Sequence, residues 1–417
     1  MNARRPRVVI VGAGFAGLAC ARALRRVPVD VTLVERTNYH LFQPLLYQVA
    51  SGLLDPSQIA APVRSVLRRT HNCDVLMAEV TSVDLQERRV HTAARDLDYD
   101  FLVVAAGSAT DYFGDASLRA RAIGLKDLDD ALALRSRLLR NFERAAVCTD
   151  AAQRKRLLTF VVVGGGPTGV EFAGAVAELI NHVLPKDYRE VDFAEVRVML
   201  CEAGDRLLPT FAPRLSRSAQ RNLERKKVDV RLGTALREVT TDGVVMPDGE
   251  SVPADMVVWT AGVRAVPLLG EGAPQVRHGR VEVTPSLHLA SHPEVFVLGD
   301  MAALDVEGQP LPMLAPVAIQ GGEHTARVIA ARLRGREDAP FRYRDKGTMA
   351  TVGRGAAVAQ IGPLHINGLI GWLIWLFIHL LYLVGFRSRL IALWTWGWNY
   401  FFYDRPVRLI TLPPPGG

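Results

Sequence analysis

Two glycine-rich turns are the features of this sequence with the clearest chemistry. The first follows the apolar segment 7–11 and contains Gly12, Gly14 and Gly17. The second follows the apolar segment 160–163 and contains Gly164, Gly166 and Gly169. Glycine at such positions permits a tight turn, close approach of the backbone to a pyrophosphate, and close packing of the following helix on the strand. Each turn therefore predicts a dinucleotide site with the pyrophosphate at a helix N-terminus.

A glutamate follows the next apolar segment in both copies. Glu35 ends the segment 31–35, and Glu202 ends the segment 196–202. A carboxylate at this place can accept hydrogen bonds from ribose hydroxyls, although a solvated surface acid is the simpler alternative for each. Two such sites on one chain predict two dinucleotides held face to face, an arrangement suited to electron transfer.

The elements that position these residues predict an α/β fold with an internal repeat. Residues 99–107 and 254–262 both run from an acid through an apolar strand to Ala-Gly, and residues 295–300 form another apolar strand ending in Gly-Asp. We expect that last strand to return to the first sheet and make the first domain discontinuous. The predicted segments are 1–115 and 263–330 for the first dinucleotide domain, 116–262 for the second, and 331–417 for a C-terminal region.

Composition excludes several other chemistries. The four cysteines (Cys20, Cys73, Cys148 and Cys201) are scattered without a CxxC pair or a Cys/His cluster. This predicts no disulfide framework, no metal site and no dithiol redox centre. Nothing in the sequence predicts a nucleic acid partner, and the apolar start is expected to be the first strand rather than a signal peptide.

The C-terminal region combines positive charge with aromatic residues. Residues 331–417 hold eleven basic and four acidic residues, which accounts for the whole net charge of +7. The uncharged stretch 369–385 has 17 residues and would span roughly 25 Å as a helix, less than the ~30 Å core of a bilayer. Five of the six tryptophans lie in this region. We expect it to lie in the membrane interface; a packed or dimerising helix and a spanning helix are the alternatives.

With these motifs in place, the chain resembles the type II NADH dehydrogenases, single-subunit NADH:quinone oxidoreductases of respiratory membranes that do not pump protons. The resemblance runs from about residue 7 to 409, and its most specific stretches are 38–50, 164–171, 258–264 and the Trp-rich tail. It implies two Rossmann-like domains of the glutathione-reductase type, followed by a helical membrane-anchoring region. It also implies FAD on the first fingerprint and NADH on the second.

The resemblance carries a set of expected cofactor contacts, with Gly299 and Asp300 near the flavin's ribityl chain. The full expected set is Gly12, Gly14, Phe15, Ala16, Gly17, Glu35, Arg36, Ala106, Gly107, Gly164, Gly166, Pro167, Thr168, Gly169, Glu171, Glu202, Ala261, Gly262, Gly299, Asp300 and Ala318. Asp300 could instead cap the next helix. Glu202 should repel a 2′-phosphate and so favour NADH over NADPH, a preference that Arg206 could soften.

Glu171 and Gln320 are the expected catalytic residues. The resemblance places Glu171 beside the nicotinamide and flavin rings, where partial burial would raise its pKa into the range for proton work. The alternatives are a role in placing NADH, or a helix N-terminal carboxylate that only complements the dipole. The family's AQxAxQQG motif aligns with residues 315–322, where Gln320 and Gly322 match but Pro316 and Gly321 replace two glutamines. Gln320 is expected at the quinone or flavin edge, or as a plain amide on a helix face.

These features predict an enzyme that passes a hydride from NADH to FAD and then electrons to ubiquinone or menaquinone. We expect a peripheral protein on the cytoplasmic face of the cell membrane, and a homodimer is possible. A reductase with a protein acceptor and a slow nucleotide-binding redox sensor are the alternatives. Truncation after Pro363 is expected to release the protein from membranes and to preserve most NADH-to-ferricyanide activity.

Overall fold

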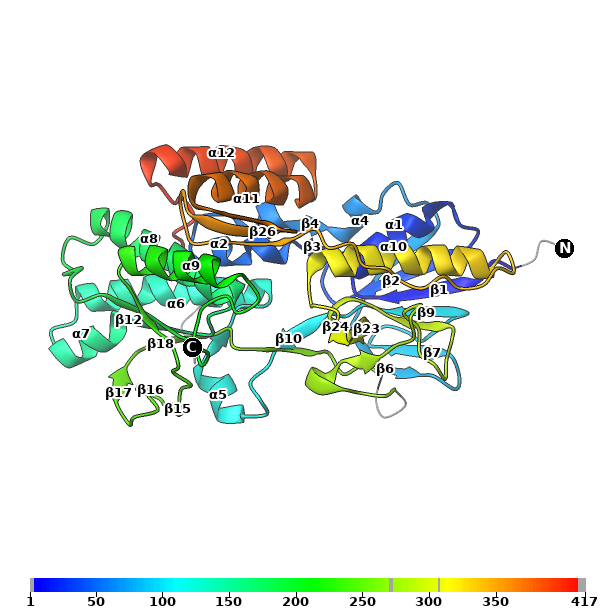
Figure 1. Ribbon diagram of the computed structural model, residues 1–417, viewed down its shortest axis with the longest axis horizontal. Helices are drawn as coiled ribbons and strands as arrows, with labels where there is room; N and C mark the ends of the chain where they lie inside the picture. The colour runs from blue at the N-terminus through cyan, green and yellow to red at the C-terminus, as the bar shows by residue number, and fades with distance from the viewer. Residues whose placement is uncertain (1–3, 270–272, 307, 412–417) are drawn as a thin grey trace. The chain divides into compact units, whose positions relative to one another are not determined.

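The structure is a computed structural model that describes residues 4–269, 273–306 and 308–411. The chain divides into two compact units. The first comprises residues 1–41, 60–109 and 263–345, and the second comprises residues 42–59, 110–262 and 346–417. Figure 1 traces the elements of both along the chain.

The first unit is built on a five-stranded parallel sheet in the order β21-β9-β1-β2-β5. Its strands are β1 (Arg7–Val11), β2 (Asp30–Glu35), β5 (Cys73–Met77), β9 (Phe101–Val104) and β21 (Val295–Val297). The strand β21 pairs with β9, which confirms that residues 295–297 return to the first sheet. Helices α1 (Phe15–Ala23) and α10 (Ala315–Arg332) lie side by side in Figure 1. A Cβ on Gly322 of α10 would lie 2.2 Å from the carbonyl oxygen of Ala16, so only glycine permits this approach.

Smaller elements complete the first unit. A three-stranded antiparallel sheet follows β5, and short strand pairs and the helix α4 border the main sheet. They are β3 (Tyr39–Leu41), β4 (Ala60–Pro62), α4 (Val63–Val66), β6 (Val80–Asp84), β7 (Arg89–Thr92), β8 (Leu97–Asp98), β10 (Ser108–Thr110), β19 (Val263–Ala265), β20 (Val281–Glu282), β22 (Ala302–Ala303), β23 (Asp305–Val306) and β24 (Gln309–Pro310). Thr110, the last residue of β10, already belongs to the second unit.

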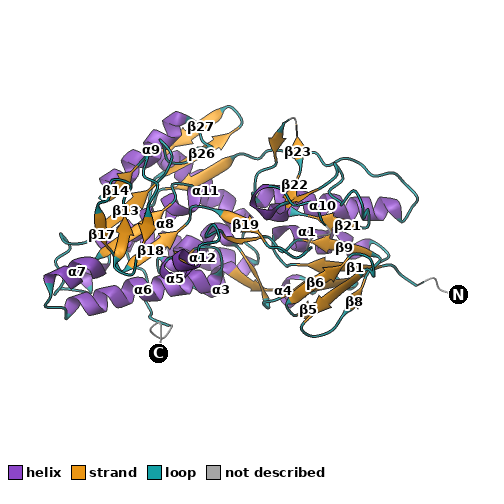
Figure 2. Ribbon diagram, turned by 90° about the horizontal axis from the view of Figure 1, so that it is seen from below, coloured by secondary structure: helices purple, strands orange, loops and turns teal. Residues whose placement is uncertain are grey.

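The second unit repeats the first sheet's plan, with parallel strands in the order β11-β18-β12-β13-β14. Figure 2 shows this sheet with its helices in purple. The strands are β11 (Ile123–Gly124), β12 (Thr159–Val163), β13 (Arg197–Cys201), β14 (Val228–Arg231) and β18 (Met256–Trp259). The central strand β12 is fully buried, as expected of a parallel strand covered on both faces. The α/β prediction with two doubly wound sheets is therefore confirmed.

The remaining elements of the second unit surround this sheet. The helices are α2 (Leu46–Ala50), α3 (Pro56–Ile59), α5 (Ala116–Arg121), α6 (Leu128–Ala146), α7 (Ala151–Leu157), α8 (Pro167–His182), α9 (Pro213–Arg225), α11 (Gly368–Tyr382) and α12 (Phe386–Phe402). The strands are β15 (Glu238–Val239), β16 (Gly243–Val245), β17 (Ser251–Pro253), β25 (Thr348–Thr351), β26 (Ala357–Ile361) and β27 (Leu364–Asn367).

The C-terminal residues do not form a unit of their own. Residues 346–417 cluster with the second unit, and so does the segment 42–59 that the sequence grouped with the first. The physical reason is packing, because α2 contacts both α6 and α8, while β25 contacts α8 and β26 contacts α9. The aromatic tail is thus part of the second unit's tertiary structure.

Candidate functional site: two dinucleotide turns and a buried carboxyl

The first glycine turn connects β1 to α1. A side chain would clash with the backbone at Gly12 and Gly17, but not at Gly14. Gly12 has φ +100°, and a Cβ there would lie 2.4 Å from the carbonyl oxygen of Ala105. A Cβ on Gly17 would lie 1.9 Å from the carbonyl oxygen of Gly12, which fixes the helix against the turn. Gly14, the N-cap of α1, is exposed, has no side-chain cap and has open space where its Cβ would be. The free helix N-terminus at Gly14 is therefore open to an anionic ligand.

The second glycine turn has the same geometry between β12 and α8. Gly164 has φ +109°, and a Cβ there would lie 2.9 Å from the backbone nitrogen of Ala261. A Cβ on Gly169 would lie 1.9 Å from the carbonyl oxygen of Gly164, as at Gly17. Gly166 is an N-cap without a side-chain cap and also borders open space, while Pro167 and Thr168 are exposed. Both turns thus form a cradle that a Cβ would fill, which fits a pyrophosphate in each.

The two strand-end glutamates are attached to these turns. Glu35 Oε2 accepts a hydrogen bond of 2.6 Å from the backbone N–H of Ala13, the middle residue of the first turn. Glu202 Oε2 accepts the equivalent bond, 2.5 Å long, from Gly165, and its Oε1 accepts one of 2.7 Å from Gly204. A carboxylate held at the edge of the glycine turn is placed to accept ribose hydroxyls. Neither glutamate is a solvated surface acid without further contacts.

Other predicted residues of the first unit gather at the end of β21. Gly299 approaches Ala16 and Ala318, since a Cβ on it would lie 3.7 and 3.4 Å from their methyl groups. Asp300 Oδ2 accepts a hydrogen bond of 2.5 Å from the hydroxyl of Ser108. Asp300 is not the cap of the next long helix, because the N-cap of α10 is Leu314.

Of the remaining predicted contacts, Phe15 begins α1 and the others follow the carboxyl ends of β2, β9 and β18. The partly or fully exposed residues among them are Phe15, Arg36, Ala106, Gly107, Ala261 and Gly262. Sequence reasoning assigned no role to His40, whose Nδ1 lies 2.8 Å from the carbonyl oxygen of Ala13 and whose ring packs edge-on against Phe15. His40 therefore stabilises the first turn through its contact with Ala13.

Glu171, the fifth residue of α8, is a buried carboxyl in an aromatic environment. It is 8% exposed, and its Oε1 accepts a hydrogen bond of 3.2 Å from the backbone N–H of Thr351 in β25. Burial raises the pKa of Glu171 to about 8, although the Thr351 N–H and the Trp375 indole both act to lower it. Burial is the dominant cause, because a charged carboxylate loses its hydration there. A pKa near 8 keeps the Glu171 carboxyl largely protonated at neutral pH, and a buried neutral carboxyl is poorly suited to complement a helix dipole.

Sequence reasoning missed the aromatic and amide side chains that enclose this carboxyl. Tyr47 is buried, and its hydroxyl accepts a hydrogen bond of 2.7 Å from Gln48 Nε2. The indole N–H of Trp396 donates to Gln48 Oε1 over 2.8 Å. Trp375 stacks on His379 with 4.1 Å between the ring centroids and contacts Tyr47 edge-on at 6.5 Å. Their signal in the sequence was the aromatic-amide loop 38–48 together with the Trp-rich tail.

The ionisation of these neighbours follows from the same burial. Burial raises the pKa of Tyr47 well above its usual value, and the negative charge that Glu171 would carry adds to the rise. Burial also lowers the pKa of His379 to about 4, so its ring is neutral and its Nδ1–H donates to the Trp375 carbonyl. The group around Glu171 is accordingly uncharged at neutral pH.

Gln320, the second predicted catalytic residue, has both ends of its amide engaged in the first unit. Its Nε2 donates to the carbonyl oxygen of Arg344 and its Oε1 accepts from the N–H of the same residue, both over 3.0 Å. This pair attaches the segment after α10 to the helix. Gly321, one of the two departures from the family motif, faces Leu287 and Leu298, so a glutamine there would point into apolar side chains.

Thiol and metal chemistry have little support in the described residues. Burial raises the pKa of both Cys20 and Cys201 to about 12, which disfavours a reactive thiolate. Within residues 4–269, 273–306 and 308–411, no group of three or more His, Cys, Asp or Glu side chains is arranged to hold a metal ion.

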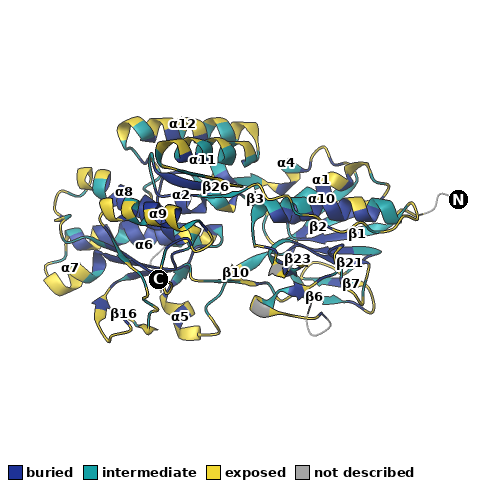
Figure 3. Cartoon of the chain, viewed as in Figure 1, coloured by how far each residue is buried: buried dark blue, intermediate teal, exposed yellow. Residues whose placement is uncertain are grey.

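The helix pair α11–α12 presents an apolar surface. Figure 3 shows both helices with extensive exposed area, and this outward surface consists of Leu369, Ile370, Leu373, Phe377, Leu381, Phe386, Leu390, Leu393, Trp394, Trp398, Phe401 and Phe402. The uncharged stretch does not continue as one helix, because it breaks at Leu383–Gly385 between α11 and α12. In the described part of the chain, no helix combines the length and apolarity needed to cross a bilayer.

The chain matches known proteins in both sequence and structure. Residues 6–322 match the model of the pyridine nucleotide-disulphide oxidoreductase family. The chain therefore belongs to that family.

Its similar proteins include two type II NADH:quinone oxidoreductases of Mycobacterium tuberculosis, Ndh and NdhA. Both are 44% identical to it over 98% of this chain, with 91% and 90% of the relatives covered. A type II NADH:quinone oxidoreductase of Staphylococcus aureus is 31% identical over 87% of this chain and 92% of the relative. Within the larger family, the chain thus belongs to the type II NADH:quinone oxidoreductases, which confirms the resemblance read from its motifs.

Solved structures agree on the fold. The structure of NDH2 from Plasmodium falciparum in complex with NADH superposes with a TM-score of 0.87 at 21% identity, covering 97% of this chain and 100% of that one. The sulfide:quinone oxidoreductase of Aquifex aeolicus gives a TM-score of 0.73 at 18% identity, over 92% and 91% of the two chains.

Proposed function

We propose that this chain oxidises NADH and passes the electrons through FAD to a membrane quinone, without pumping protons. The observation that carries this function is the pair of equivalent glycine turns, one in each unit, each with a glutamate held against it. Two dinucleotides in one chain, in a family of NADH:quinone oxidoreductases, are the donor NADH and the resident FAD.

The first unit is the FAD domain in this proposal, and residues 116–262 of the second form the NADH domain. The open cradle at Gly14, the uncapped start of α1 and the carboxylate of Glu35 fit the pyrophosphate and a ribose of FAD. Asp300, which accepts the Ser108 hydroxyl, offers a polar group to the ribityl chain of FAD. The small side chains of Ala16 and Ala318 pack closely beside Gly299 at the same place. When bound, FAD supplies the chemistry that accepts a hydride and releases electrons to the acceptor.

The protein's own residues bind and orient the substrate. The N-terminus of α8 at Gly166 receives the NADH pyrophosphate, and Glu202 accepts the adenosine ribose hydroxyls and disfavours a 2′-phosphate. Glu171 holds a proton at neutral pH, which makes it a proton donor for quinone reduction. Gln320 as a quinone contact remains a prediction, with its amide now known to bind the Arg344 backbone.

The apolar surface of α11 and α12 supports association of the enzyme with the membrane surface. Side chains such as Trp394 and Phe401, 72% and 74% exposed, suit the interface between headgroups and acyl chains. We assign the protein to the cytoplasmic face of the cell membrane as a peripheral protein, where NADH and a quinone (ubiquinone or menaquinone) are both within reach. A homodimer is compatible with this arrangement and is tested by its mass in detergent.

The experiment that tests the function follows flavin absorbance anaerobically in detergent-purified protein. NADH should bleach the flavin absorbance at ~450 nm as fast as enzymes typically turn over. A short-chain quinone should then restore the absorbance, and the cycle should repeat many times. Bleaching without reoxidation by quinone would point to a protein acceptor instead. Slow or absent bleaching would contradict the enzyme and favour a redox sensor.

A further inference from the structure

Phe113 is an aromatic residue in the second unit whose exposure and backbone both need an explanation. It is 61% exposed, and its backbone φ is +53°, in the left-handed region that bulky residues rarely adopt. Of the other bulky apolar and aromatic residues with positive φ in the described chain, Leu208 and Leu287 are buried in the core, and Tyr403 is half-buried as the C-cap of α12. Burial compensates their strain, whereas Phe113 gains little from packing. Backbone strain of this kind is typical of ligand-binding positions.

The turn that carries Phe113 is fixed from several directions. The N–H of Phe113 donates to Asp111 Oδ1 over 2.8 Å, and the N–H of Asp111 donates to the carbonyl oxygen of Gly262 over 3.0 Å. The indole N–H of Trp259 donates to the Asp111 carbonyl oxygen over 2.9 Å. These contacts attach residues 111–113 to the carboxyl end of β18, so the ring of Phe113 has a defined position.

The ring lies against Gly262, in the segment that follows β18 and adjoins the second glycine turn. A Cβ on Gly262 would lie 3.3 Å from Cζ of Phe113, and the ring meets Trp259 edge-on with 6.1 Å between centroids. The neighbouring Ala261 is exposed and touches the start of the second glycine turn, since a Cβ on Gly164 would lie 2.9 Å from its backbone nitrogen. Phe113 therefore stands beside the place where a dinucleotide crosses from β12 towards β18.

The strand order decides which half of the dinucleotide lies there. Ligands of open parallel sheets bind outside the carboxyl ends of the strands at the point where the strand order reverses, which here lies between β12 and β18. Glu202 directly follows β13, on the other side of β12, and defines the adenosine side. The opposite half of the molecule must extend over β18, where Phe113 presents its ring to solvent.

We propose that Phe113 contacts the nicotinamide half of NADH and orients it at the carboxyl end of β18. This inference rests on the proposed function, because it needs NADH at the second glycine turn. The ring supplies a flat apolar face for the nicotinamide mononucleotide portion, as aromatic side chains do for bases elsewhere. The strained φ of Phe113 holds that face of the ring towards solvent. The strain lowers the stability of the folded protein when no nucleotide is bound.

The test compares three substitutions by NADH-to-ferricyanide kinetics and thermal unfolding of the full-length holoenzyme. Phe113→Ala and Phe113→Gly should raise KM for NADH about tenfold, with kcat within about twofold of wild type, and Phe113→Tyr should restore KM. Phe113→Gly should also raise the Tm, since glycine relieves the positive φ. Val147→Ala, at an 81% exposed apolar residue elsewhere in the unit, is the matched control and should change neither quantity.

A competition measurement locates the contact within the nucleotide. ADP-ribose lacks the nicotinamide, so its inhibition constant should be the same for wild type and Phe113→Ala. An unchanged KM for NADH in both the Ala and Gly variants would overturn the proposal. An inhibition constant for ADP-ribose that rises by the same factor as KM would also overturn it. A failure of the proposed function is distinguishable, because the wild-type protein itself would then not oxidise NADH.

Discussion

Replacing Glu171 by glutamine tests whether the carboxyl is protonated in the folded protein. The folded pKa of about 8 lies above the ordinary carboxyl value of 4.5 because the group is buried. Below about pH 4.5 the carboxyl is neutral in both folded and unfolded chains, and its protonated form contributes its full stability. As pH rises towards 8, the unfolded chain ionises while the folded chain must keep its proton, so this stability is progressively lost.

The magnitude follows from the difference between the two pKa values. A separation of roughly 3.5 pH units corresponds to about 5 kcal/mol, reached above pH 8 and already growing through neutrality. Glutamine has nearly the same shape and no titration, so Glu171→Gln should not share this loss. We expect the Tm of Glu171→Gln minus that of wild type to increase steadily between about pH 5 and pH 8 and then to level off.

Thermal unfolding followed by tryptophan fluorescence across that pH range measures the difference. Glu195→Gln is a suitable control, because Arg154 lowers the pKa of the half-buried Glu195, so the sign of the pH dependence is reversed. There the wild type should be the more stable protein at neutral pH, and the gap should close as pH falls. Parallel Tm curves for wild type and Glu171→Gln would refute the reasoning and remove Glu171 as a proton donor near neutral pH.

Three further predictions concern the edges of the site. Arg405→Ala should lower the free energy of unfolding by about 3–5 kcal/mol in denaturant titrations, because it removes a 2% exposed guanidinium that binds two backbone carbonyls and Glu178. The control is Arg408→Ala, which removes a more exposed side chain and should cost about 1 kcal/mol or less. Glu202→Gln should narrow the ratio of kcat/KM for NADH over NADPH, and an unchanged ratio would remove Glu202 from the ribose site. Replacing Trp394 and Phe401 together by serine should weaken sedimentation with anionic vesicles while ferricyanide activity persists, and undiminished sedimentation would contradict the proposed membrane surface.

The parts of the site that the sequence predicted are those specified by local chemistry. Gly12 and Gly164 must adopt a positive φ, and Gly17 and Gly169 have no room for a side chain. Both requirements arise within a few residues of each turn. The strands that carry the turns are short apolar runs bounded by glycine and acids, which reveal their type without tertiary information. For the same reason the return of 295–297 to the first sheet could be inferred from its repeat of the pattern.

The surroundings of Glu171 could not be predicted because they are assembled from distant segments. Gln48 and Trp396 are 348 residues apart and meet through one hydrogen bond of 2.8 Å. Neither an amide in a loop nor a tryptophan in an apolar helix indicates its partner, and many pairings would bury similar area. The same holds for Phe113, whose significance depends on a backbone angle that no pattern of residue types reveals.

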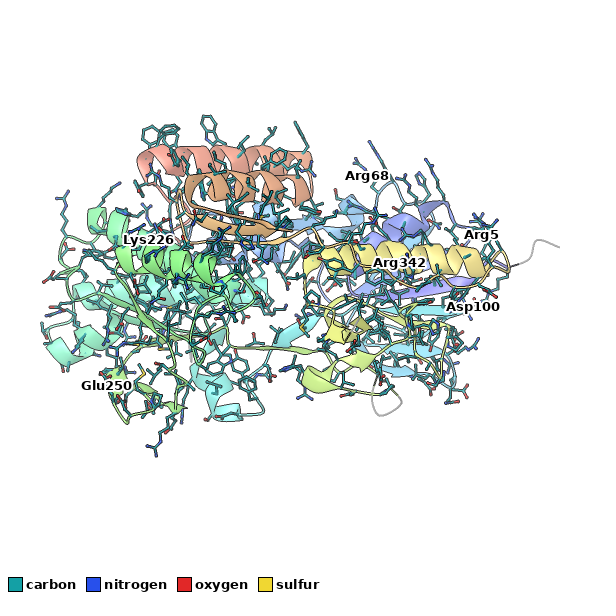
Figure 4. The ribbon with its side chains drawn as sticks, viewed as in Figure 1. Arg5, Arg68, Asp100, Lys226, Glu250 and Arg342 are labelled. Atoms are coloured by element: carbon teal, nitrogen blue, oxygen red, sulfur yellow. The ribbon has the colours of Figure 1, made fainter. Side chains whose placement is uncertain are left out.

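These distant contacts also change how the membrane surface must be tested. Sequence reasoning treated the tail as an appendage whose removal after Pro363 would spare the dehydrogenase reaction. Yet Arg405 donates to the carbonyls of Ser51 and Ala175 over 2.9 Å, and its guanidinium lies 3.5 Å from Glu178. Glu178 also accepts from Lys226, labelled in Figure 4, over 2.7 Å.

Glu178 stands seven residues after Glu171, two turns further along α8, the helix whose N-terminus faces the NADH pyrophosphate in our proposal. Truncation would remove the Arg405 donor from the Ser51 and Ala175 carbonyls, the indole partner of Gln48 and one of the two cationic partners of Glu178. It would also remove Trp375, His379 and Trp396 from the enclosure of Glu171. Loss of activity in a truncated protein would therefore report a damaged α8 rather than a lost anchor. Only the outward side chains of α11 and α12 separate membrane binding from catalysis, because they contact solvent and leave the buried network intact.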